Sequence, residues 1–468
     1  MSNTTLTRLP EAMPDLTQAS ADLQARRISA VELLEQALGR IGALDSKLHA
    51  FIALAEPRAR AAALNADLRI ARGEAGPLTG IPYALKDIYD VAGMRTTAHS
   101  KLRLDHMAEE NSDAADRLDA AGMVFLGKLS THEFARGGPT DLLPFPNAKN
   151  AWNTGHFAGG SSSGSGVAVA SGMVGLAMGT DTGGSIRLPA ACNGIVGLKP
   201  TYGRVSRRGI VPLSFSMDHA GPLTRTVADC ALAMQALAGH DANDAASSRQ
   251  PVPDYSAGLS GDLKGLTIGR AREFDALAGV GPEQMAALDA VEAVLEALGA
   301  RIIEVSLPER ELLDAMTWAI IQAEGVSIHG KDLRERPEEY GRTTRERLMM
   351  GAFATGGHYV TAQRLRPILS AEVTKVLTGA NAILCSPMGG PAPLVAEVDD
   401  LPWRKQAPLT SAFNGTGHPA LVLPAGFGAN GLPLSAQFVG RPFDEAMLLR
   451  IGHAYEQMAG WVAKRPAY

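Results

Sequence analysis

Two serines in glycine-rich segments are the residues best suited to chemistry in this sequence. Ser161 lies in Ala158-Gly-Gly-Ser-Ser-Ser-Gly-Ser-Gly166, and Ser185 lies in Gly179-Thr-Asp-Thr-Gly-Gly-Ser-Ile-Arg-Leu-Pro189. The segment between them is rich in small apolar residues and is too apolar for a linker. Glycine lets backbone N–H groups come close to a ligand. A serine beside such amides can act as a nucleophile next to an oxyanion hole.

A serine nucleophile needs a base, and the sequence offers several. A lysine can serve if burial holds it neutral. Lys86 is the best candidate because it ends the apolar stretch 80–85, which we expect to be a short buried strand. Lys128 and Lys199 are rivals by the same reasoning. The 11 histidines leave a Ser–His–Asp triad open by count, although none lies in a segment that resembles a catalytic loop.

Three other motifs favour different chemistry less well. Gly160–Gly164 matches the G-x-S-x-G nucleophile elbow, but no strand precedes it as an elbow requires. Asp181-Thr-Gly183 resembles the aspartic-protease motif, but the second copy that would share its proton is missing. We therefore expect Asp181 to organise its loop, by pairing with Arg187. No His, Cys, Asp or Glu residues have metal-ligand spacing, so we expect no metal.

Composition favours a large cytoplasmic protein. The 468 residues are 46% apolar, which is enough to bury a core of one large or two smaller α/β domains. A net charge of −5 argues against a nucleic-acid surface. Cys192, Cys230 and Cys385 are scattered, which fits free thiols in a reducing compartment. The apolar stretch 167–178 is too short to span a bilayer, and residues 1–6 lack the pattern of a secretory signal.

Strand and helix signals alternate along the chain, which favours the α/β class. A capping box at Ser29–Glu32 predicts a helix that continues to about Leu44. Further helices are expected at residues 56–72, 112–121, 167–171, 226–238, 282–298 and 443–458, with a mostly helical, charged region at 309–377. Strands are expected at residues 123–126, 174–178, 266–269, 300–305, 382–385, 420–423 and 434–439.

Taken together, these motifs resemble the amidase-signature hydrolases, which use a Ser–cis-Ser–Lys triad. The matching motifs are Gly159-Gly-Ser-Ser162 and, with its serine 24 residues beyond Ser161, Gly179–Pro189. Segments 194–201, 218–225, 414–420 and 431–437 continue the resemblance over nearly the whole chain. It implies a single domain over residues 1–468, with a central mixed, twisted β-sheet flanked by α-helices on both faces. Residues 1–75 would form an N-terminal helical layer, 76–240 the core with the triad, and about 309–377 a helical substrate-side segment.

The same resemblance implies a role for each residue of the motifs. Ser185 would be the nucleophile, Ser161 the proton shuttle after a cis peptide bond, and Lys86 the base. The oxyanion hole would consist of the N–H groups of Thr182, Gly183, Gly184 and Ser185. Ser162, Asp181 and Arg187 would support the loop. The chemistry runs through an acyl-enzyme and needs no cofactor.

The family contains free-standing amidases, carbamate and ureide hydrolases, and the glutamine-hydrolysing subunit of a tRNA-dependent amidotransferase. In the last branch an acidic residue precedes the residue that matches Asn414, whereas residues 406–413 contain none. We therefore expect a free-standing amidase for hydrophobic or aryl amides. Carbamate or ureide hydrolysis is the alternative, and the rival is the amidotransferase subunit. The expected partner is a small-molecule substrate, with no nucleic acid and no membrane; homodimers occur in the family.

Substrate choice is expected to lie in two segments. One is the loop 133–140, with Phe134, Gly137 and Gly138, and the other is the helical segment 318–369, with Met350 and Phe353. These apolar residues would line a pocket for an acyl or aryl group. The competing interpretation is that they pack between helices.

Overall fold

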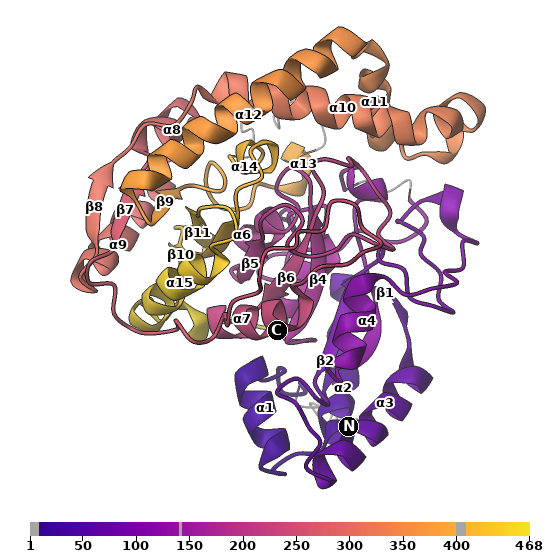
Figure 1. Ribbon diagram of the computed structural model, residues 1–468. Helices are drawn as coiled ribbons and strands as arrows, with labels where there is room; N and C mark the ends of the chain where they lie inside the picture. Colours follow the sequence, from indigo (N-terminus) through magenta and orange to yellow (C-terminus); the bar gives the residue numbers. More distant parts are fainter. Residues whose placement is uncertain (1–8, 140–142, 399–408) are drawn as a thin grey trace, which may run out of the picture.

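A computed structural model describes residues 9–139, 143–398 and 409–468. Its centre is an 11-stranded sheet with the order β1-β3-β2-β4-β6-β5-β10-β11-β9-β7-β8 (Figure 1). The strands are β1 (Phe51–Leu54), β2 (Pro82–Lys86), β3 (Val124–Leu129), β4 (Leu176–Asp181), β5 (Val196–Lys199), β6 (His219–Thr224), β7 (Thr267–Arg270), β8 (Arg301–Glu304), β9 (Ala382–Cys385), β10 (Ala420–Phe427) and β11 (Pro433–Val439).

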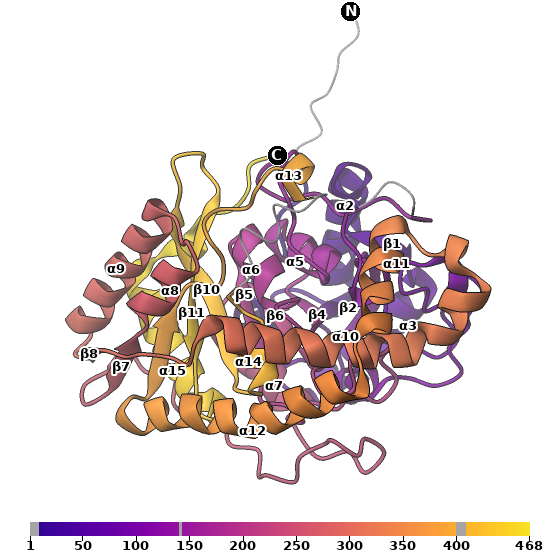
Figure 2. The ribbon, with the colours of Figure 1, turned by 90° about the horizontal axis from the view of Figure 1, so that it is seen from above.

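The sheet is mixed, as the family resemblance implies. Strand β2 runs parallel to β3 and β4, and β7 runs parallel to β8 and β9, whereas the remaining pairs are antiparallel. Figure 2 shows α5 and α6 on one side of the central strands and α7 and α15 on the other. Strands β2, β3 and β4 are buried along their whole length, as parallel strands covered on both faces are. The division into one domain stays a prediction; a single sheet that takes strands from residues 51–439 supports it.

The helices have the following bounds: α1 (Leu16–Gln24), α2 (Ala30–Leu48), α3 (Glu56–Ala71), α4 (Asp113–Ala120), α5 (Ser163–Ala170), α6 (Arg187–Asn193), α7 (Val227–Leu237), α8 (Arg272–Leu277), α9 (Pro282–Ala297), α10 (Arg310–Glu335), α11 (Arg342–Met349), α12 (Gly356–Gly379), α13 (Val395–Val398), α14 (Ala412–Gly415) and α15 (Glu445–Ala459). The predicted capping box of α2 is present, since Ser29 and Glu32 exchange side-chain and backbone hydrogen bonds. None of the described helices is long and apolar enough to cross a membrane.

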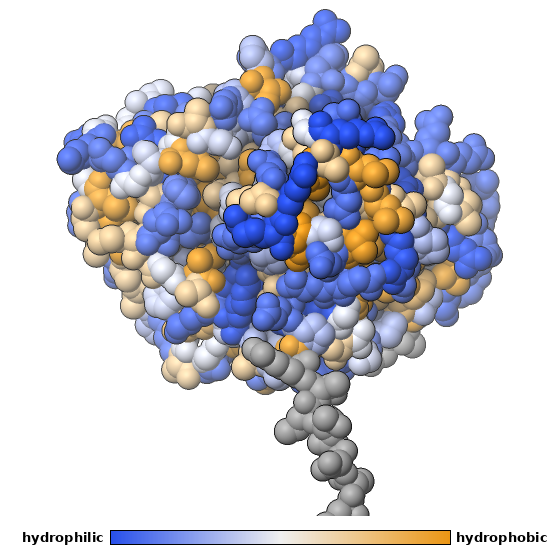
Figure 3. Space-filling model, turned by 90° about the horizontal axis from the view of Figure 1, so that it is seen from below, coloured by the Kyte–Doolittle hydropathy of each residue, from blue (hydrophilic) through white to orange (hydrophobic). Residues whose placement is uncertain are grey.

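The N-terminal helices α1–α3 form one end of the molecule (Figure 1). In α3, Ala59, Ala63 and Ala66 are buried, whereas Leu64 and Leu68 are exposed. Figure 3 views this end from below, and its surface is largely hydrophilic with hydrophobic residues gathered in smaller areas. The described part of this layer, residues 9–75, is therefore a packing layer with a mixed outer surface.

Helices α10 and α12 run side by side along the opposite end of the molecule (Figures 1 and 2). The predicted helical content of residues 309–377 is therefore confirmed. Within this charged region, Tyr340 is nevertheless buried, against Phe134 and His329.

The sequence patterns did not predict strands β1, β5 and β6 or the core helix α6. Strand β6 contains Gly221 and Pro222, and α6 contains Pro189, which are residues that normally indicate turns. Strand β3 continues beyond its predicted end at Leu126 because Lys128 is buried and paired with Asp87. Tertiary contacts override the local signal in these segments.

Candidate active site

Lys86 and Ser161 are in direct contact in the interior. Lys86 is the last residue of β2 and is fully buried. Its Nζ donates hydrogen bonds to Ser161 Oγ at 2.7 Å and to Thr180 Oγ1 at 2.8 Å. Burial lowers the pKa of Lys86 to about 7, although the charges of Asp218 and Asp181 oppose this shift. A lysine with this pKa is neutral in a large fraction of molecules near neutral pH and can accept a proton from the serine.

The two rival lysines have different partners. Lys128 Nζ lies 2.9 Å from Asp87 Oδ1, and both side chains are fully buried. Lys199 Nζ donates to the carbonyl oxygens of His418, at 2.6 Å, and Pro200, at 3.2 Å. In the described ranges, the Nζ of neither lysine forms a hydrogen bond to a serine. Lys86 is therefore the lysine that the fold brings to a serine hydroxyl.

The peptide bond before Ser161 is cis, as predicted. The carbonyl oxygen of Ser161 accepts hydrogen bonds from His132 N and Thr131 Oγ1, each at 3.0 Å. The imidazole of His132 lies so close to Gly160 that any Cβ at this position would overlap the ring. Burial, with the positive charges of Arg347 and Lys86, lowers the pKa of His132 to about 3, so the ring is neutral. His132 therefore fixes the backbone at Ser161, a role that the sequence patterns did not predict.

Ser185 lies in the turn between β4 and α6 and is half-buried. Asp181, at the end of β4, holds this turn: its carboxylate accepts from Gly184 N at 2.7 Å and Ile186 N at 3.1 Å. Burial alone would raise the pKa of Asp181, but Arg187, Lys199 and Asn414 together hold it well below its usual range. The carboxylate is therefore ionised.

Arg187 ties the same turn to the C-terminal part of the chain. It forms the predicted ion pair with Asp181, at 2.9 Å, and both side chains are fully buried. Its other donors reach Thr410 O at 2.9 Å, Gln437 Oε1 at 2.8 Å and Asn414 Oδ1 at 2.6 Å. The loop around Ser185 is thus supported by residues more than 200 positions further along the chain.

The backbone N–H groups of residues 182–185 are not all free to donate a hydrogen bond to a substrate. The predicted oxyanion hole includes Gly184, but its N–H donates to Asp181 and is not free for a substrate. Within the described residues, the N–H groups of Thr182, Gly183 and Ser185 have no protein acceptor. A Cβ at Gly184 would overlap the side chain of Thr410, and its φ is +134°, so glycine is required there. A Cβ at Gly183 would meet Trp318 at an ordinary 3.6 Å, which leaves space in front of this amide.

Ser162 joins the two serine segments. Its Oγ donates to Thr180 O and accepts from Thr180 N, both at 3.2 Å, and its backbone N–H donates to Ser185 O at 3.3 Å. Thr180 therefore contacts both Lys86 and Ser162. The sequence places Thr180 in the Gly179–Pro189 motif, and that was the only signal for it.

The residues predicted to bind substrate do not form one pocket. Phe134 is buried, with its ring 4.6 Å from that of His329 and 5.6 Å from that of Tyr340. Gly137 and Gly138 pack against residues 344 and 343 of α11. Met350 and Phe353 are 47% and 82% exposed. The competing interpretation, packing between elements, fits the first three, whereas the last two lie on the surface. Thr140, in the predicted loop, lies outside the described residues.

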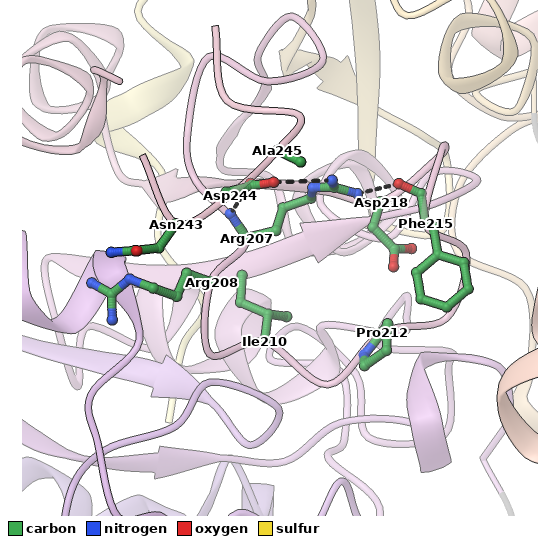
Figure 4. A pocket seen from close by; sticks show the side chains of 9 residues that line it. All are labelled: Arg207, Arg208, Ile210, Pro212, Phe215, Asp218, Asn243, Asp244 and Ala245. Atoms are coloured by element: carbon green, nitrogen blue, oxygen red, sulfur yellow. Dashed lines mark hydrogen bonds and ion pairs between the residues drawn. The ribbon is translucent and has the colours of Figure 1, made fainter. Parts of the chain in front are cut away.

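A cavity of about 250 Å³ is lined by residues of the segments 207–218 and 243–245 (Figure 4). Asp218 lines it, and its Oδ1 accepts from Thr182 Oγ1 at 2.5 Å, so the cavity wall contacts the loop that carries Ser185. Phe215 also lines a second cavity of about 630 Å³, beside Glu324 and Tyr359 of α10 and α12. Within the described ranges, no three His, Cys, Asp or Glu side chains are grouped to hold a metal ion.

Comparison with known proteins gives the family of this chain. Residues 32–449 match the Amidase family, to which the chain therefore belongs. The protein is an amidase, an enzyme that acts on carbon–nitrogen bonds other than peptide bonds. The amidase-signature fold predicted from the sequence is confirmed.

Three relatives illustrate the similarity. The A subunit of glutamyl-tRNA(Gln) amidotransferase from Geobacter metallireducens is 39% identical over 94% of this chain and 96% of its own length. The crystal structure of the protein of the same name from Thermotoga maritima has a TM-score of 0.80 at 30% identity, covering 95% and 94% of the chains. A structure described as a vestigial protein complex that reveals the origins of an s-triazine catabolic enzyme has a TM-score of 0.89 at 34% identity, covering 96% and 99%.

Two predictions are corrected by these findings. The free-standing amidase for hydrophobic or aryl amides is wrong, because relatives that match over nearly their full length are amidotransferase subunits. The exclusion of nucleic acid is also wrong, because these relatives are named for a tRNA substrate. The first error came from weighing one missing acid too heavily; part of that stretch, residues 406–408, lies outside the described ranges. The second came from the net charge, which describes one chain and not an assembly.

Proposed function

We propose that this chain is the glutamine-hydrolysing subunit of a tRNA-dependent amidotransferase. It cleaves the side-chain amide of glutamine and releases ammonia for a partner that amidates a charged tRNA. The names of the relatives support this role, because their sequences match this chain over nearly the whole length of both proteins. The 2.7 Å contact between Lys86 Nζ and Ser161 Oγ carries the chemical part of the proposal. A protein with this role works in the cytoplasm.

The proposed reaction has two halves. In the first, neutral Lys86 accepts a proton from Ser161, Ser161 accepts one from Ser185, and Ser185 Oγ attacks the amide carbon. The N–H groups of Thr182, Gly183 and Ser185 stabilise the oxyanion. Ser161 then protonates the leaving nitrogen and regains its proton from Lys86, so ammonia departs and a neutral relay and an acyl-enzyme remain. In the second half, water gives a proton through Ser161 to Lys86 and attacks the ester. The relay returns this proton to Ser185 Oγ as the C–O bond breaks and glutamate leaves.

The charge of the chain is compatible with this role if another subunit makes most of the tRNA contacts. Association with tRNA is dominated by basic groups that neutralise phosphates. This chain has 44 Lys and Arg against 49 Asp and Glu, so we expect the partner to supply most of the basic groups. The subunit therefore works as the ammonia-producing half of the assembly.

The test is to purify the chain under native conditions from its own host and to measure ammonia release from glutamine. We expect a stable complex with glutaminase activity that exceeds the activity of the isolated chain, and we expect Ser185→Ala to abolish it. A panel of anilides, carbamates and ureides serves as the comparison. A chain that remains alone and hydrolyses this panel faster than glutamine would refute the proposal.

A further inference from the structure

One peptide unit of the Ser185 loop, between Gly183 and Gly184, is held at both of its polar groups. The carbonyl oxygen of Gly183 accepts a hydrogen bond from Thr410 Oγ1 at 2.7 Å. The N–H of Gly184 donates to Asp181 Oδ1, also at 2.7 Å. The carbonyl and the N–H of a trans peptide point in opposite directions from one rigid plane. The two hydrogen bonds therefore prevent this plane from turning about the chain.

The backbone alone does not fix the orientation of this peptide. It lies between two glycines, and glycine has more conformational freedom than any other residue. Asp181 belongs to the same loop and holds the N–H side. Thr410, which holds the carbonyl side, is 227 residues away in the sequence. The orientation of the peptide therefore depends on a hydroxyl group from the C-terminal part of the chain.

Thr410 is itself fixed by its surroundings. Its side chain is fully buried and lies against Gly184, where a Cβ would overlap it. Its carbonyl oxygen accepts from Arg187 Nη1 at 2.9 Å and from Phe413 N at 3.2 Å. Arg187 in turn pairs with Asp181, at 2.9 Å. Thr410, Arg187 and Asp181 therefore surround the held peptide with connected hydrogen bonds.

Two free N–H groups lie on either side of this peptide, on the partly exposed residues Gly183 and Ser185. Neither has a protein acceptor in the described part of the chain. Thr182, Gly184 and Ile186, by contrast, are buried. Because the rest of the loop is anchored, a rotation of the held peptide must be compensated at its neighbours. Such a rotation therefore changes the direction of the two free N–H groups.

We propose that Thr410 is a positioning residue for the oxyanion hole beside Ser185. Its hydroxyl holds the Gly183 carbonyl and so keeps the N–H groups of Gly183 and Ser185 directed at the carbonyl oxygen of a bound substrate. Since Thr410 is fully buried, it acts through the loop and not by contact with the substrate. The inference rests on the proposed function, because it takes Ser185 as the nucleophile.

The contribution of Thr410 belongs to the transition state. Negative charge develops on the substrate oxygen as Ser185 attacks, so well-directed N–H groups stabilise the transition state more than the bound substrate. Loss of a direct oxyanion donor costs about 10²–10³-fold in kcat, and displacement of a donor that is still present costs less. The loss of the Thr410 hydroxyl should therefore lower kcat and leave KM nearly unchanged.

The experiment compares Thr410→Val with Thr410→Ser in the protein purified under native conditions. Valine keeps the shape of threonine without the hydroxyl, whereas serine keeps the hydroxyl. Thr410→Val should lower kcat for glutamine by about 10–100-fold and change KM by less than about threefold. Thr410→Ser should keep kcat within about threefold of the wild type, because the hydrogen bond to Gly183 remains.

A second assay uses no amide substrate. A fluorophosphonate labels a serine nucleophile, and its reaction also places negative charge on an oxygen in the oxyanion hole. The rate of labelling at Ser185 should fall in Thr410→Val by about the same factor as kcat and should recover in Thr410→Ser. If Thr410→Val does not fold, as judged by thermal unfolding, Thr410→Ala takes its place in both assays.

Thr224→Val is the matched control. Thr224 is also fully buried, and its Oγ1 donates to the backbone carbonyl of Thr226 at 2.9 Å. It pairs with Leu176, at the opposite end of β4 from Asp181. Thr224→Val should therefore keep kcat and the labelling rate within about threefold of the wild type.

Equal losses in Thr410→Val and Thr410→Ser would show that Thr410 acts by packing and would overturn the inference. Wild-type kcat in Thr410→Val, or a loss confined to KM, would overturn it as well. Failure of the amidotransferase role gives a different result: the native protein lacks glutaminase activity, while labelling still distinguishes Thr410→Val from Thr410→Ser. Absence of labelling at Ser185 in the wild type would overturn both.

Discussion

The loop that carries Ser185 is held by buried, hydrogen-bonded side chains, whereas the helices α10–α12 expose many of theirs to solvent. Around Ser185, the side chains of Asp181, Arg187 and Asn414 are fully buried, and hydrogen bonds join all three to one another. On α10–α12 and the short turn between α11 and α12, Met349, Phe353, Val360 and Ile368 face the solvent. Several buried hydrogen bonds therefore fix the loop that carries Ser185, whereas the exposed side chains of the helical region have few contacts. We expect substitutions to affect the two regions very differently.

The largest effect should come from Ser185→Ala. Loss of the nucleophile removes the covalent step, and we expect kcat to fall by on the order of 10⁴-fold or more. Stability should change little, because the side chain is half-buried and an alanine fits the turn. Ammonia release measures the first effect and thermal unfolding the second. Retained activity would show that another residue attacks the substrate.

Lys86→Met should follow, with a loss of about 10³-fold in kcat, in the range for removal of a general base. Methionine fills nearly the same volume in the buried site but cannot accept a proton. Steady-state kinetics measure the change. Lys128→Met is the matched comparison: if it inactivates the folded enzyme and Lys86→Met does not, the assignment of the base is wrong.

Gly184→Ala should cost about 10²-fold in activity and about 1–3 kcal/mol in stability, because the new Cβ collides with Thr410 at a positive φ. Gly183→Ala should differ, since its Cβ makes only ordinary contact with Trp318. We expect this variant to keep the stability of the wild type and lose activity, because the methyl group occupies ligand space. Chemical denaturation and kinetics of both variants distinguish the effects.

The pH profile should show a single ionisation of Lys86. Its pKa is lowered to about 7, and the active form is the deprotonated one. Activity should therefore rise with pH, with kcat/KM falling about tenfold for each unit below pH 7 and levelling off above it. A profile of kcat/KM between pH 5 and 9 checks this sign. Activity that instead increases as the pH falls below 7 would contradict a neutral-lysine base.

The smallest effect should come from Phe353→Ala, which removes a side chain that is 82% exposed. We expect the free energy of unfolding to change by no more than about 0.5 kcal/mol and activity by less than about twofold. The buried comparison is Phe134→Ala, in the cluster with His329 and Tyr340, which should cost about 3–5 kcal/mol in stability. A large loss of activity in Phe353→Ala would restore its predicted place at the substrate.

Sequence reasoning was most effective where residue types are constrained locally. The glycine-rich motifs singled out Ser161 and Ser185. The end of an apolar strand made Lys86 the best of three candidate lysines, and the family resemblance then selected it. The pairing of Asp181 with Arg187 followed from their spacing in one loop. His132 was not identified, because its role depends on a contact with Gly160 that no local pattern reports. Strand β6 was missed because Gly221 and Pro222 normally indicate a turn.

The hydrogen bonds from Arg187 to the C-terminal region affect when, during its own translation, this chain can complete its active site. Thr410, Asn414 and Gln437 are translated long after Ser185, and until they emerge Arg187 lacks three of its acceptors. The nascent chain therefore contains both serines and the lysine well before their supporting network is complete. The supporting network is complete only when the last part of the chain has been made, so we expect a chain truncated before Thr410 to be inactive.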